Sequence, residues 1–197
     1  MIKKYVFGVL ILISNFVSSQ NTAPSFYFDT LKFKELQALE LDCFYDTDSN
    51  QVCLKETEIG YQKTINLVNS FYVISYQYFK TTTSIHRTGK FFQMIPVGIH
   101  YEYYDDGRLA RAINFDKDYL ISIDSLASIV KNSFEKDILN PNEKVVVTRG
   151  IYNESRFYSV KFPINNKENS PVRELIINGK TGDLITDMTK EPTASTN

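Results

Sequence analysis

Short apolar runs alternate with clusters of turn-forming residues along the first half of the chain. Residues 36–45 and 51–59 are separated by Asp46-Thr-Asp-Ser-Asn50, which predicts a hairpin with a five-residue loop. Residues 71–79 (FYVISYQYF) are rich in β-branched and aromatic side chains on both faces, as in a central strand. These runs predict a series of antiparallel hairpins.

A further hairpin is predicted over residues 99–115, around the dipeptide Asp106-Gly107. Asp-Gly suits a tight turn because glycine freely adopts the positive φ that such a turn requires. A two-residue loop places opposite charges across the strands, and large rings across from small side chains, which favours this register. The expected facing pairs are Glu102 with Arg111, Tyr101 with Ala112, and Tyr103 with Ala110.

The apolar period changes after Tyr119. From Ile123 to Ile138 apolar residues recur every three or four positions, with Ser122 placed to cap and Asp124 in the first turn. This pattern predicts an amphipathic helix of about 15 residues. Asn140-Pro141-Asn142 is expected to end it.

Three more strands are predicted after the helix, over residues 144–152, 155–164 and 171–178, and residues 188–197 are expected to form a frayed tail. A helix with one apolar stripe needs a sheet on which to bury it. The fold class expected is therefore α+β and β-rich: antiparallel hairpins or a meander, followed by one helix packed on a three- to four-stranded antiparallel sheet.

The N-terminus has the pattern of an export signal. A short basic start, Lys3 and Lys4, precedes an uncharged apolar stretch that ends in small residues. This predicts a signal peptide over residues 1–19, cleaved between Ser19 and Gln20, and no cysteine nearby would carry a lipid. The stretch is shorter than the ~20 residues that cross a bilayer, although an uncleaved anchor or a buried core helix stays an alternative. We expect a secreted or periplasmic protein whose mature chain has no transmembrane segment.

Composition narrows the classes of partner. The 197-residue chain has a formal net charge of -1, and loss of the two signal-peptide lysines makes it more negative. Such a balance gives no attraction to nucleic acid or to an anionic membrane. Tyrosine (13) and phenylalanine (14) account for an aromatic content of 14% without tryptophan, which favours sheet packing or a ring-lined binding surface.

Cys43 and Cys53 are the two thiols of the chain. The predicted hairpin centres on Asp48 and places them opposite each other, where facing Cα atoms lie ~4.5–5.5 Å apart. In an oxidising compartment this geometry predicts a cross-strand disulfide worth ~2–3 kcal/mol. The alternative is a pair of reduced thiols.

Other candidate chemistry is incomplete. Asp46, Asp48 and Asn50 match the start of a calcium-binding EF-hand loop, but Gln51 replaces the required glycine and Thr57 the bidentate glutamate. The segment is therefore interpreted as a solvated turn.

The two histidines, His86 and His100, have no nearby motif that supplies a nucleophile or a third metal ligand. The chain also contains none of the common nucleotide-binding, hydrolase or metalloprotease fingerprints. We expect no catalytic residue, no metal site and no cofactor, and a structural role for both histidines.

Two stretches resemble known families. The segment Arg87-Thr-Gly89-Lys-Phe, followed by the strand and the turn Asp105-Asp106-Gly107-Arg-Leu109, resembles the MORN-like repeat of YwqK-type proteins in one copy, over about residues 87–115. Those repeats have a glycine before the first strand, aromatic residues within it and an Asp/Asn-Gly turn.

Residues 121–185, with a capped helix, three strands and the closing phrase Ile177-Asn-Gly-Lys-Thr-Gly182-Asp-Leu-Ile185, resemble a PepSY-like domain. The turn residues in that phrase fold the last aliphatic pair back onto the sheet. The resemblance implies an exported module that binds or restrains other proteins, including peptidases, without catalytic residues.

The organisation expected is a signal peptide, a β-rich region over residues 20–118, a PepSY-like unit over 119–187 and the tail. The function expected is an exported, non-catalytic protein-binding or inhibitory module whose partner is another exported or envelope protein. The alternatives are a small secreted hydrolase that uses carboxylates, since such pairs leave no motif, and a self-associating structural component of the cell envelope. The oligomeric state stays open.

Overall fold

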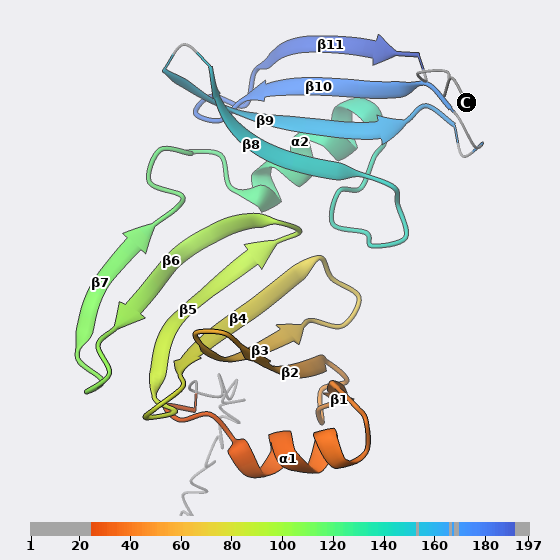
Figure 1. The fold of residues 1–197 in the computed structure, drawn as a ribbon. Coiled ribbons are helices and arrows are strands. Elements are labelled where there is room, and N and C mark those ends of the chain that lie inside the picture. The colour runs from red at the N-terminus through yellow and green to blue at the C-terminus, as the bar shows by residue number, and fades with distance from the viewer. Residues whose placement is uncertain (1–24, 153, 166, 168–169, 192–197) are drawn as a thin grey trace, which may run out of the picture.

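The computed structural model describes residues 25–152, 154–165, 167 and 170–191. It contains two antiparallel sheets and two helices, α1 (Thr30–Ala38) and α2 (Ile123–Phe134), which confirms the β-rich α+β class. Figure 1 shows α1 at one end of the large sheet, and the small sheet with α2 at the other. The predicted signal peptide and its cleavage site lie outside the described residues.

The large sheet is a seven-stranded meander in which each strand pairs with the next along the chain. Its strands are β1 (Cys43–Tyr45), β2 (Gln51–Thr57), β3 (Gly60–Asn66), β4 (Tyr72–Phe79), β5 (Ile85–Phe92), β6 (Ile95–Tyr103) and β7 (Leu109–Asn114). The five-residue loop between β1 and β2 is confirmed. There the Asp46 carboxylate accepts the backbone N–H groups of Asp48 (3.0 Å) and Asn50 (2.8 Å), so this segment acts as a turn.

The β6–β7 hairpin differs from its prediction at the tip. Two expected pairs are confirmed: Glu102 with Arg111, and Tyr101 with Ala112. The loop has three residues, because the Gly107 N–H donates to the carbonyl of Tyr104 (2.9 Å) and Gly107 has φ 85°. Tyr103 therefore faces Leu109, and a bulge at Ala110 restores the predicted register beyond it.

Part of the segment predicted as the first strand is helical. Residues 36–45 were expected to be extended, but Ala38 and the residues before it belong to α1, and β1 begins only at Cys43. The Asp29 side chain caps this helix by accepting the Lys32 N–H (2.9 Å). Phe33 and Leu36, three residues apart on one helix face, are buried against the large sheet.

The small sheet has the order β11-β10-β9-β8. Its strands are β8 (Val146–Tyr152), β9 (Ser155–Pro163), β10 (Val172–Asn178) and β11 (Leu184–Lys190). The three predicted strands are confirmed, and the turn chemistry around Gly179 and Gly182 returns the chain as a fourth. Residues 188–190 therefore belong to a strand rather than to the predicted tail, and residues 192–197 lie outside the described range.

Helix α2 begins as predicted and ends earlier. The Ser122 hydroxyl accepts the Ser125 N–H (3.0 Å), which confirms the N-cap. The helix stops at Phe134 because Glu135 adopts left-handed backbone angles (φ 57°). Ile138 is fully buried all the same, from the turn that follows.

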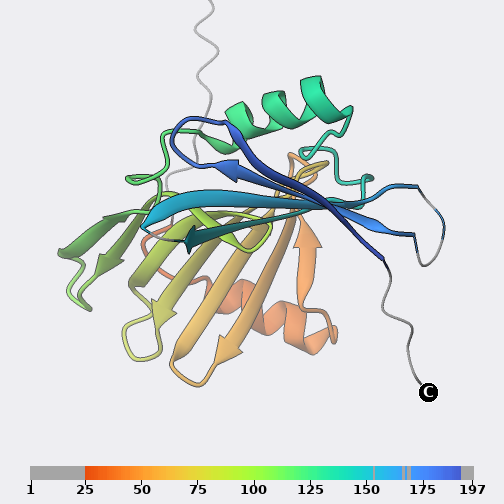
Figure 2. The same ribbon diagram turned by 90° about the horizontal axis from the view of Figure 1, so that it is seen from above.

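Two hydrophobic clusters hold the fold together. One lies between α1 and the large sheet and includes Tyr76 and Tyr78. The other joins α2 and the small sheet to the end of the large sheet, through Phe92, Ile95 and Val97. Figure 2 shows α2 lying along the small sheet. The strongly buried tyrosines lie in these clusters, so many of the aromatic side chains of the chain pack in the core.

Candidate functional site

One face of the large sheet has no buried side chain. Side chains alternate between the two faces of a sheet, and the face toward α1 carries buried residues such as Val52, Leu54 and Tyr78. On the opposite face, which we call the open face, every side chain is at least partly exposed. From β2 to β7 the open face carries Gln51, Cys53, Lys55, Thr57, Gln62, Thr64, Asn66, Val73, Ser75, Gln77, Phe79, Arg87, Gly89, Phe91, Pro96, His100, Glu102, Arg111 and Ile113.

His100 lies at the centre of a ring cluster on the open face. Its ring centroid is 5.0 Å from that of Phe91 and 4.6 Å from that of Phe115. Its Nε2 donates to the carbonyl of Lys90 (3.0 Å). The ring covers Gly89, where an added Cβ would lie 2.3 Å from Nδ1, so a larger residue at this position must displace the His100 ring.

The second histidine packs against another ring of the open face. The centroids of His86 and Phe79 are 4.5 Å apart. Burial, followed by the charge of Arg87, lowers the pKa of His86 below its ordinary value, so the ring is neutral at pH 7. Both histidines thus have ring partners on this face.

Three charged side chains form a row across β5, β6 and β7. Arg87 and Arg111 are the direct cross-strand neighbours of Glu102 on its two sides. Glu102 accepts Nη2 of Arg111 (2.9 Å) and contacts Nε of Arg87 (3.1 Å). The hydrogen bond from Arg111, with the nearby Arg87 charge, lowers the pKa of Glu102 and keeps it ionised.

A hollow of about 190 Å³ lies between this charged row and the ring cluster. Ser75, Gln77 and Gly89 form part of its lining. The Oε1 atom of Gln77 is buried and accepts no hydrogen bond from any described residue. Polar and aromatic groups therefore converge on one depression of the open face.

The disulfide lies at the edge of the same sheet. Cys43 faces Cys53 with a Cα–Cα distance of 4.0 Å, and the two sulfurs are bonded, which confirms the predicted pairing. It ties the short edge strand β1 to β2.

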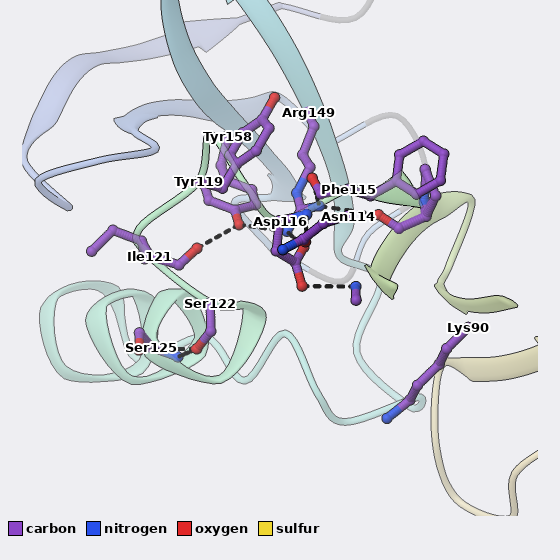
Figure 3. Close-up of polar contacts among 12 residues, drawn as sticks. Lys90, Asn114, Phe115, Asp116, Tyr119, Ile121, Ser122, Ser125, Arg149 and Tyr158 are labelled. Carbon is purple, nitrogen blue, oxygen red and sulfur yellow. Dashed lines mark hydrogen bonds and ion pairs between the residues drawn. The ribbon is translucent and has the colours of Figure 1, made fainter. Parts of the chain in front are cut away.

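A second candidate site lies where the two sheets meet (Figure 3). Arg149 of β8 has a side chain that is only 9% exposed. Its guanidinium donates to the Pro96 carbonyl (3.0 Å) and the Tyr158 hydroxyl (2.9 Å), and Nη2 lies 2.8 Å from Oδ1 of Asp116. The guanidinium also stacks on Tyr119, 4.3 Å from the ring centroid.

The partners of Arg149 are themselves fixed. The Tyr158 hydroxyl donates to the carbonyl of Ile121 (2.6 Å), just before α2, and burial raises the pKa of Tyr158. Oδ2 of Asp116 accepts the Gly98 N–H (2.7 Å). Nη2 of Arg149 approaches Oδ1 of Asp116 without hydrogen-bond alignment, and Nε of Arg149 is buried without an acceptor among the described residues. These charges connect the two sheets.

Next to this network lies a cleft of about 360 Å³. Lys90 and Tyr72 line it from the large sheet and Asp124 from the start of α2. Nζ of Lys90 lies 3.9 Å from the Tyr72 ring centroid, and the Tyr72 hydroxyl lies 3.5 Å from Asp124. Burial, followed by the charge of Asp124, raises the pKa of Tyr72 to about 12, so the hydroxyl stays protonated at neutral pH.

Sequence reasoning did not single out Arg149, Asp116 or Tyr158. A signal was present, because Arg149 continues the alternation of Val145 and Val147, which places it on the inward face of β8. A charged residue in such a position indicates a buried pair.

The outer face of the small sheet carries a further charge cluster. Glu174 is buried between Lys161 and Lys190 and accepts the Ser159 hydroxyl (2.8 Å). The bond from Lys190 and the other two partners lower the pKa of Glu174 to about 2.

Within the described ranges, no group of three or more histidine, cysteine, aspartate or glutamate side chains is placed to hold a metal ion. No helix of those ranges is long and apolar enough to cross a membrane. No family model matches the chain, and no curated protein and no solved structure is significantly similar to it. The MORN-like and PepSY-like assignments therefore stay predictions.

Proposed function

We propose that the protein is an exported, non-catalytic binding module that docks another exported protein on the open face of its large sheet. The observation that carries the proposal is this face itself: a broad sheet surface with no buried side chain and two packed ring clusters. Exposed apolar patches that are rimmed by polar residues mark interaction sites or ligand-binding grooves.

The open face is suited to binding because its central rings are already packed before a partner arrives. The rings of Phe91, His100 and Phe115 already pack against one another, so little side-chain entropy is lost on contact. Rings also supply contact area together with polar edges.

Charge indicates an acidic partner. Among the open-face positions of β2 to β7, Lys55, Arg87 and Arg111 outnumber the single acid Glu102, although the whole chain has a net charge of -1. Complementary charge steers association and selects the partner.

Export rests on the signal-peptide pattern and on the disulfide, because disulfides persist in oxidising compartments. The resemblance of residues 121–185 to a PepSY-like domain supports the same role, because it implies an exported module that binds or restrains other proteins. A binding or inhibitory module needs no catalytic group.

Site-specific photo-crosslinking tests the proposal. A photoreactive amino acid replaces Gln77 on the open face, and in the control it replaces Leu31 of α1, whose side chain points away from the sheet and is 75% exposed. With the secreted and envelope fractions of the source organism, we expect one dominant acidic protein crosslinked at position 77 and none at position 31. Equal labelling at both positions, or none at position 77, contradicts the proposal.

A carboxylate-dependent hydrolase is the second candidate, because Asp116 and Asp124 both line the cleft between the sheets. Turnover of peptide or glycoside substrates by the mature chain, lost in Asp124→Asn, would favour it over the binding module. A fully folded Asp124→Asn variant that keeps the turnover would exclude the cleft as its site.

A further inference from the structure

We propose that the open face recognises an extended acidic segment in which an Asp or Glu side chain stands two residues from a large apolar side chain. The carboxylate binds between Arg87 and Arg111, and the apolar side chain enters the hollow beside His100. This inference rests on the proposed function and specifies the chemistry of the partner.

The charged row has donors left for a ligand carboxylate. A guanidinium has five N–H groups, of which Arg111 donates Nε–H and one Nη2–H to Glu102, whereas Arg87 forms an ion pair with Glu102 through Nε. The side chains of Arg87 and Arg111 are 49% and 59% exposed, whereas that of Glu102 is 17% exposed. Two cations around one carboxylate leave the row with a positive charge, and Glu102 holds both of them in place.

The charged row and the ring cluster are two residues apart along the strands, which is the spacing of neighbouring side chains on one face. Glu102 and His100 are two residues apart on β6, and so are Arg111 and Ile113 on β7. Neighbouring side chains on the same face of a strand lie about 6.5–7 Å apart. An extended segment that runs along β6 has the same spacing between its own residues i and i+2, so one side chain can reach the row while the other reaches the hollow.

The hollow has the size and lining for one apolar side chain. Its volume of about 190 Å³ is below the ~300–1,000 Å³ of pockets that hold a whole small ligand, and it leaves room for one apolar side chain. Phe91, His100 and Phe115 line it, so its wall is largely aromatic. The arginine row and the ring-lined hollow lie side by side. Together they select a segment that carries both an acidic and an apolar side chain.

Nuclear magnetic resonance titration of the mature chain tests this inference with blocked synthetic peptides. The probe is acetyl-Gly-Ser-Glu-Ser-Phe-Ser-Gly-amide. One comparison peptide has glutamine for the glutamate, and a second has the glutamate and phenylalanine adjacent. We expect saturable shifts of the Nε–H signals of Arg87 and Arg111 with the probe, and about tenfold weaker binding with either comparison peptide.

The test variant combines Arg87→Gln with Arg111→Gln and should reduce probe binding about tenfold. The control variant is Arg156→Gln on the small sheet, which should leave probe binding unchanged. Equal binding of the glutamate and glutamine peptides overturns the inference, as does no saturable shift with any peptide. A further peptide has a free C-terminal carboxylate and no acidic side chain. If it binds as well as the probe, the carboxylate that the arginines recognise is not necessarily that of a side chain, and this part of the inference is overturned.

These results are separable from a failure of the proposed function. If crosslinking at position 77 persists in the double arginine variant, the open face binds a partner by other contacts, and only the acidic motif is wrong. Loss of crosslinking in a His100→Asp variant that keeps both arginines shows that the ring cluster contributes to the same site.

Discussion

Replacing Arg149 with methionine removes the guanidinium that joins β8 to the end of the large sheet. The variant loses the bonds to the Pro96 carbonyl and the Tyr158 hydroxyl and the contact with Asp116, while the methionine stem keeps part of the packing on Tyr119. Each hydrogen bond of a charged group contributes about 1.5 kcal/mol or more. Relief of the cost of burying a charge offsets part of the loss.

The net result should be a free energy of unfolding lower by about 3 kcal/mol, or a Tm lower by about 6–12 °C for a chain of this size. Arg156→Met is the matched control. Arg156 also pairs with an aspartate, Asp118, but its side chain is 27% exposed and that of Asp118 is 49% exposed. An exposed pair contributes less than about 1 kcal/mol.

Urea unfolding of the oxidised protein, followed by circular dichroism, measures both variants under the same conditions. The reasoning predicts a clear separation between them. If Arg149→Met costs no more than Arg156→Met, the junction network does not stabilise the contact between the sheets, and the interpretation of Arg149 is wrong.

Three further predictions concern other contacts. Replacing both cysteines with serine should lower the free energy of unfolding by about 2–3 kcal/mol, and reduction of the native protein should give the same loss. The pKa of Glu174 is about 2 in the folded protein and 4.5 ordinarily, so the free energy of unfolding should fall as the pH drops from about 5 to about 2. In an acid titration of stability, Glu174→Gln should flatten this dependence. An unchanged slope would assign the dependence to other carboxylates. Gly89→Ala should lower the free energy of unfolding by about 1–3 kcal/mol because the new Cβ meets the His100 ring. In a double-mutant cycle, His100→Ala should recover part of that loss, whereas additive losses would refute the contact.

The strands could be predicted where local chemistry decides them. The register of the β1–β2 hairpin and most of the register around Glu102 follow from turn residues and facing pairs. Helix α1 was missed because the run Leu36 to Leu41 continues its apolar character past the helix end at Ala38, and no local signal separates the two. A capping aspartate at position 29 was the available hint.

The candidate site could not be predicted in the same way. Its parts lie on strands whose order in the sheet, and whose coverage by α1, depend on packing over the whole chain. The composition of residues 71–79 predicts apolar side chains on both faces, yet Ser75 and Gln77 lie on the open face and the tyrosines of this strand on the other. Which face stays uncovered is a tertiary property.

The hydrophobic cluster that joins Phe92, Ile95 and Val97 to α2 has a practical consequence for dissecting the molecule. Dividing the chain between residues 118 and 119, or building a chimera with that boundary, would expose these three side chains to solvent. It would also leave α2 with only part of its apolar contacts. Neither fragment is then expected to be soluble by itself. Expression, immobilisation and display of this protein should keep the segment from residue 25 to residue 191 in one piece.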